Sequence, residues 1–134
     1  MNKYIGTKII EAEKQLRNNE EGYKVVYPDN YVSWSPKSVF EEAYRKTDGL
    51  TFGLAIEALK KGFKVARKGW NGKGMFVYYV PPASYKATTE IVKKQFGELV
   101  EYNAYLAIKN VNGTVSTWVP SINDVLSEDW EISK

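Results

Sequence analysis

The sequence contains neither cysteine nor histidine. Without cysteine the chain has no disulfide framework and no thiol nucleophile. Without histidine it has no imidazole base, no catalytic triad and no zinc site of the usual kinds. These absences exclude a large share of enzyme mechanisms. We therefore expect no catalytic residues, no metal site and no cofactor of these kinds.

Long apolar runs are also missing. No stretch approaches the roughly 18 residues that a helix needs to cross a bilayer. The first ten residues, MNKYIGTKII, lack the long apolar segment of a signal peptide. We therefore expect a soluble, cytoplasmic protein that has no membrane partner.

The composition is that of a folded protein. The chain has 134 residues, of which 43% are hydrophobic and 26% charged, as is typical of one globular domain with or without a small appendage. Aromatic residues make up 14% of the chain. This is more than a modest core requires, so we expect some of them to face a ligand or a partner.

Positive charge is concentrated in one region. The net charge is +3, and residues 1–48 contain eight basic and eight acidic side chains, so the surplus lies entirely after them. Such a surplus favours binding of phosphate or another anion, and the alternative is a solvated helix face beside a lysine-protected edge strand. Between residues 50 and 74, Glu57 is the one acidic side chain and the basic ones are Lys60, Lys61, Lys64, Arg67, Lys68 and Lys73.

Residues 1–48 predict a β-β-β-α module. Strand-like runs at 3–10, 23–27 and 31–34 are separated by a polar loop and by Pro28-Asp29-Asn30, a turn signature. Ser35 and Pro36 then predict the start of a helix, with Ser35 as its cap.

Residues 49–134 predict a second domain, and the summed pattern is an α+β fold with helices packed on an antiparallel, meander-like sheet. Thr51 is a plausible helix cap and Gly62 a helix stop. Residues 83–100 are ambiguous between a helix and a loop. Asn112-Gly113 predicts a type I′ hairpin turn. The other expected elements are strands at 63–67, 75–80, 102–111, 114–119 and 128–132, and a helical turn at 121–126.

A glycine-rich segment, residues 67–74, lies between two of the expected strands. Its three glycines allow close backbone approach to a ligand, Arg67 and Lys73 supply charge for phosphate, and Trp70 offers a flat face for a base. The alternative is a tight turn whose tryptophan packs back on the core. The segment has neither the P-loop nor the dinucleotide-binding pattern.

A second cluster comprises Trp118, Pro120, Ser121 and Asp124. Trp118 is suited to stacking on a ring, and Ser121 and Asp124 to hydrogen bonds with a ribose or an amine. The alternative is a tryptophan that covers the core, followed by a helix cap. The carboxylates near this cluster do not establish an acid–base pair for hydrolysis. The 16 acidic residues scattered along the chain disfavour binding of single-stranded nucleic acid.

From residue 50 onward the sequence resembles the second Thoeris anti-defence family of phage proteins. The resemblance rests on LTFGLAIEALKKG at 50–62, VARKGWNGKGMF at 65–76, Trp118 with Pro120-Ser121, and the terminal EDWE at 128–131. Residues 1–48 look like a module that is sometimes joined to such domains in phage proteins.

The resemblance implies a sponge, a protein that binds a cyclic ADP-ribose-type immune signal without cleaving it. It also implies a homo-oligomer, commonly a tetramer, that acts in the cytoplasm of the infected bacterium. Some family members also bind cyclic dinucleotides. The alternatives are a nucleotide-degrading enzyme and a phage structural or nucleic-acid-binding protein. The ligand-binding residues expected from the motifs and the resemblance together are Phe52, Arg67, Trp70, Asn71, Lys73, Trp118, Ser121 and Asp124.

Overall fold

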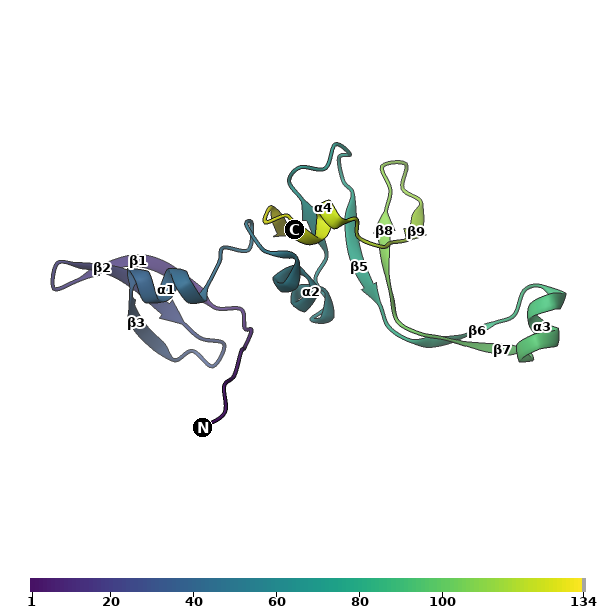
Figure 1. Cartoon of the computed structure of the whole chain (residues 1–134), viewed down its shortest axis with the longest axis horizontal. Coiled ribbons are helices and arrows are strands. Elements are labelled where there is room, and N and C mark those ends of the chain that lie inside the picture. The colour runs from purple at the N-terminus through teal and green to yellow at the C-terminus, as the bar shows by residue number, and fades with distance from the viewer. Residues whose placement is uncertain (134) are drawn as a thin grey trace. The chain divides into compact units, whose positions relative to one another are not determined.

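The structure, a computed structural model, describes residues 1–133 and is shown in Figure 1. The chain divides into two compact units, the first from Met1 to Lys46 and the second from Thr47 onward. No helix of the described residues is both long enough and apolar enough to span a membrane. Each unit is described separately below.

The first unit is a three-stranded antiparallel sheet followed by a helix. Its strands pair in the order β1-β2-β3, and Val25 is buried among them. The Phe40 ring of the helix stacks on Tyr23 of β2, with centroids 4.1 Å apart. Gly22 lies so close to Trp34 that a Cβ atom would come within 2.3 Å of the indole. The elements are β1 (Glu11–Arg17), β2 (Glu20–Val26), β3 (Val32–Pro36) and α1 (Lys37–Ala43).

The turn at Pro28-Asp29-Asn30 is confirmed, but two expectations for this unit are wrong. Residues 3–10 form no strand and the first strand is β1, because the turn at Asn18 and Asn19, both at positive φ, pairs residues 11–17 with β2. Ser35 does not cap α1. It is held in β3 by pairing with Tyr23, and Pro36 occupies the cap position instead.

The second unit contains a five-stranded antiparallel sheet of order β10-β4-β5-β8-β9 and three helices. The α+β fold class is confirmed. Thr51 caps the first of these helices as expected, since its Oγ accepts from the Leu54 amide, and Gly62 follows the helix end with φ of +94°. The elements are α2 (Phe52–Lys60), β4 (Val65–Arg67), β5 (Phe76–Val80), β6 (Ala83–Lys86), α3 (Glu90–Phe96), β7 (Leu99–Tyr102), β8 (Tyr105–Lys109), β9 (Val115–Thr117), α4 (Ile122–Leu126) and β10 (Trp130–Ile132).

The two faces of the five-stranded sheet differ. Side chains alternate along a strand, so the core face carries the buried residues Val65, Val77, Ile108 and Trp130, which pack with α2. Helix α4 packs against α2, and α3 against β7. Among the helices of residues 47–133, therefore, none packs on the opposite face, which we call the open face.

Residues 83–100, ambiguous from the sequence, form most of an arm. Strands β6 and β7 pair with each other, with Ala83 opposite Tyr102, and α3 connects them. Figure 1 shows this arm extending away from the five-stranded sheet.

The hairpin around Asn112-Gly113 is confirmed, but its turn type was wrongly predicted. Gly113 has φ of +85°, whereas Asn112 is absent from the residues of positive φ, so the two do not form a type I′ turn. The loop is longer. It is closed by the Asn110 amide on the Thr114 carbonyl, and the Asn112 side chain accepts from Thr114 instead of setting a two-residue turn.

Candidate functional site

The glycine turn, residues 68–74, connects β4 to β5. Two of its glycines are needed for the backbone conformation of the turn. A Cβ atom on Gly72 would come within 2.2 Å of the Met75 sulfur, and Gly74 has φ of +76°, a conformation that favours glycine. Glycine at these two positions is therefore required by the shape of the turn.

Arg67, at the end of β4, fixes this turn to the C-terminal part of the chain. Its Nε donates to Asp129 Oδ1 and its Nη1 to Asp124 Oδ1, both at 2.9 Å. The second oxygen of Asp129 accepts from the Gly69 amide at 3.0 Å. The Arg67 side chain is 19% exposed. One guanidinium thus joins the glycine turn, α4 and the segment before β10.

The electrostatics of this triad match its geometry. Hydrogen bonds to Asp129 and Asp124 raise the pKa of Arg67 above its ordinary value. Burial alone would raise the pKa of Asp124, but the Ser121 amide and Arg67 outweigh it and hold that pKa below its usual range. Burial likewise opposes ionisation of Asp129, and hydrogen bonds from Arg67 and the Gly69 amide lower its pKa. All three groups are charged at neutral pH.

Asp124 also belongs to the cap of α4. Ser121 and Asp124 form a capping box, in which each side chain accepts from the other residue's amide, at 3.1 and 2.9 Å. The Asp124 carbonyl accepts from the Trp130 indole at 2.8 Å. The helix cap expected at residues 121–124 is present, and these side-chain atoms are occupied within the chain.

Four aromatic rings form a cluster at the core face. Trp130 is fully buried, and the half-buried rings of Phe52, Trp70 and Trp118 surround it, with centroids at 5.5, 5.3 and 5.9 Å. Trp70 and Trp118 meet edge to face at 6.3 Å. Each surrounding ring keeps part of its surface exposed.

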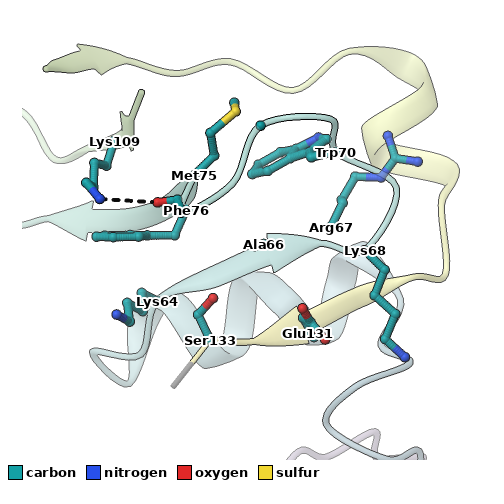
Figure 2. A pocket seen from close by; sticks show the side chains of 12 residues that line it. Lys64, Ala66, Arg67, Lys68, Trp70, Met75, Phe76, Lys109, Glu131 and Ser133 are labelled. Carbon is teal, nitrogen blue, oxygen red and sulfur yellow. Dashed lines mark hydrogen bonds between the residues drawn. The ribbon is translucent and has the colours of Figure 1, made fainter. Parts of the chain in front are cut away.

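A cavity of about 340 Å³ lies beside the glycine turn (Figure 2). Ala66 lies among its lining residues, and Phe76, Met75 and Trp70 contribute apolar side chains. Gly72, Gly74 and Ser133 also line it, together with five charged side chains. They are Lys64, Arg67, Lys68, Lys109 and Glu131.

The expected ligand-binding residues do not all meet in this cavity. Arg67 and Trp70 line it. Phe52 and Trp118 lie in the aromatic cluster, Ser121 and Asp124 in the helix cap, and Asn71 and Lys73 are exposed on the glycine turn.

Among the lining residues that were not identified as site residues from the sequence are Phe76, Lys109 and Glu131. Lys64 was noted only as part of the basic surplus. The sequence signal that could have identified them is the alternation of side chains along a strand. It places these residues on the other face of the sheet from the buried Val65, Val77, Ile108 and Trp130. Knowing which strands are neighbours was also necessary.

Fold and cavity together define the class: an α+β domain that presents a basic and aromatic cavity beside a glycine turn held by one arginine. The family model described as the Thoeris anti-defense 2-like domain matches residues 50–133. A curated protein of Bacillus phage SP01, Thoeris anti-defense 2, is 40% identical over 86 residues, which cover 62% of this chain and 93% of that protein. The chain belongs to the Thoeris anti-defense 2-like family.

Replacing Arg67 tests its structural role. In Arg67→Ala, two partly buried carboxylates lose their cation, so we expect the free energy of unfolding to fall by about 2–3 kcal/mol. Urea unfolding followed by tryptophan fluorescence measures this. Lys94→Ala, at an exposed lysine of α3, is the control and should change stability by less than about 0.5 kcal/mol. An Arg67→Ala variant as stable as the control would contradict this role.

We expect the protein to lose stability in acid because Asp124 and Asp129 become protonated. The pKa values of Asp124 and Asp129 are lower in the folded chain than the unfolded value of about 3.9. Their contribution is therefore complete above about pH 5 and is lost as the pH falls through the folded values. Urea midpoints between pH 7 and pH 2 measure this loss. It should be smaller in Asp124→Asn/Asp129→Asn, and an equal loss in that variant would assign the acid sensitivity to other groups.

Proposed function

We propose that the protein binds a cyclic ADP-ribose-type immune signal, or a related cyclic nucleotide, and sequesters it without cleaving it. By keeping the signal from its effector, it blocks TIR-dependent immunity in the cytoplasm of the infected bacterium. The observation that carries the proposal is the cavity beside the glycine turn, which combines aromatic surface and positive charge within residues matching the anti-defense family.

Aromatic faces hold the base in this proposal. Trp70 borders the cavity and is braced by Trp118 and Trp130, so its orientation is fixed before binding. A preformed site loses little entropy when the ligand enters. Asn71 and Lys73, exposed on the glycine turn, supply polar contacts from its tip.

Sequestration requires high affinity for the signal. The protein acts by mass action, so its dissociation constant must lie near or below the signal concentration. Burial and pre-organised polar contacts provide such affinity without a nucleophile, a base or a metal. The sequence, which has no histidine and no cysteine, suits this role better than degradation of the nucleotide.

A homo-oligomer, with the tetramer as the expected form, is part of the proposal. The arm supports it, because five large apolar side chains of β6, α3 and β7 are exposed in the single chain. Tyrosine is also enriched at protein interfaces. The five are Tyr85 (45%), Ile91 (78%), Phe96 (62%), Leu99 (64%) and Tyr102 (49%).

The fate of the bound nucleotide tests the proposal. The purified chain is incubated with cyclic ADP-ribose, separated from free ligand, heat-denatured and analysed by chromatography. We expect intact cyclic ADP-ribose to be released in proportion to the protein. A control without protein measures spontaneous hydrolysis. A chemically altered product would support a nucleotide-degrading enzyme instead, and salt-sensitive binding of oligonucleotides without cyclic nucleotide binding would support a nucleic-acid-binding protein.

A further inference from the structure

The positive charges that line the cavity are not equivalent. Arg67 is held by two carboxylates, and Lys68 Nζ lies 3.7 Å from an oxygen of Asp48. Within residues 1–133, Lys64 and Lys109 have no carboxylate oxygen within 4.0 Å. The charge available to an anion therefore lies on these two lysines.

One aromatic ring orients both of these lysines. The Lys64 ammonium lies 4.6 Å, and the Lys109 ammonium 5.6 Å, from the centroid of the Phe76 ring. A cation at the face of an aromatic ring is attracted by its quadrupole. In Figure 2 the ring is seen edge-on, with Lys109 above it and Lys64 below it. Lys109 Nζ also donates to the Gly74 carbonyl at 3.4 Å, which connects it to the glycine turn.

Strand register places these groups together on the open face. Lys109 of β8 is opposite Phe76 of β5, and Glu131 of β10 is opposite Ala66 of β4. Because Val65 pairs with Val77 in the antiparallel β4–β5 pair, Ala66 comes to lie beside Phe76. The row from Glu131 through Ala66 and Phe76 to Lys109 thus has a carboxylate at its β10 end and an unpaired ammonium at its β8 end. Lys64, two residues before Ala66, lies on the same face because side chains alternate along a strand.

Arg67 differs from these lysines in what binding an anion would require. An anion that approached its guanidinium would meet Asp124 and Asp129, whose carboxylates already neutralise its charge and also bond the helix cap and the Gly69 amide. In the described part of the chain, Lys64 and Lys109 have no such carboxylate partners. An ammonium group forms strong, charge-assisted hydrogen bonds with phosphate oxygens.

The geometry points to an anion site on the open face, in which Lys64 and Lys109, positioned by Phe76, bind the diphosphate of the nucleotide while Arg67 only holds the turn. This inference rests on the proposed function for the identity of the ligand. The chemistry of the site is that of a diphosphate, so free pyrophosphate is the simplest probe for it.

The test measures binding by calorimetry with two probes, cyclic ADP-ribose and inorganic pyrophosphate. We expect Lys64→Gln/Lys109→Gln to weaken binding of both at least tenfold. Lys60→Gln/Lys61→Gln, with the same change in net charge at the C-terminal end of α2, is the matched control and should change binding less than about twofold. Glu131→Gln removes the nearby negative charge and should tighten binding about two- to fivefold. Circular dichroism checks that each variant is folded.

The outcomes separate this site from the proposed function. If the wild-type chain binds cyclic ADP-ribose but the Lys64→Gln/Lys109→Gln variant binds it equally well, the site is wrong and the proposed function stands. If pyrophosphate binding depends on the two lysines while no cyclic nucleotide binds, the site stands and the proposed function fails. Equal losses in the α2 control and the test variant would also overturn the site, because they would reflect net charge alone.

Discussion

The ion pairs of Arg67 with Asp124 and Asp129 are the interaction on which the rest of the second unit depends. They join three segments that are distant in sequence: the glycine turn, the cap of α4 and the segment entering β10. The same connection sets Trp130 in the core, because its indole donates to the Asp124 carbonyl, and Phe52, Trp70 and Trp118 pack around it. A partly buried arginine with two carboxylates is stable only while all three remain charged and bonded.

This arrangement separates the charges that build the unit from those that remain available. Arg67 is the most conspicuous cation of the glycine-rich segment, yet its charge is neutralised within the chain. Lys64 and Lys109 keep theirs on the open face of the sheet, beside the cavity. For the proposed sequestration of an anionic nucleotide this division is favourable, because a site that had to break its own ion pairs to bind would lose affinity through the cost of rearrangement.

Local signals in the sequence were sufficient for several elements. Thr51 and Gly62 set the ends of α2 through capping and left-handed backbone geometry, and the Ser121 cap of α4 follows the same local chemistry. The strand expected at residues 3–10 failed because alternation does not say which segment finds a pairing partner, and the partner of β2 is β1.

The site was only partly predictable for the same reason. Arg67 and Trp70 stand out within one contiguous motif and do line the cavity. Lys109 and Glu131 reach it from β8 and β10, through the non-sequential strand order β10-β4-β5-β8. Spacing along the chain carries no information on that order, so the open face could be recognised only once the sheet was assembled.

The most direct measurement is a crystal structure of the chain with cyclic ADP-ribose bound. Our account predicts an intact nucleotide with its phosphate oxygens within hydrogen-bond distance of Lys64 and Lys109, and Arg67 still bonded to Asp124 and Asp129. A cleaved nucleotide, or phosphates on an Arg67 that has released both carboxylates, would contradict it.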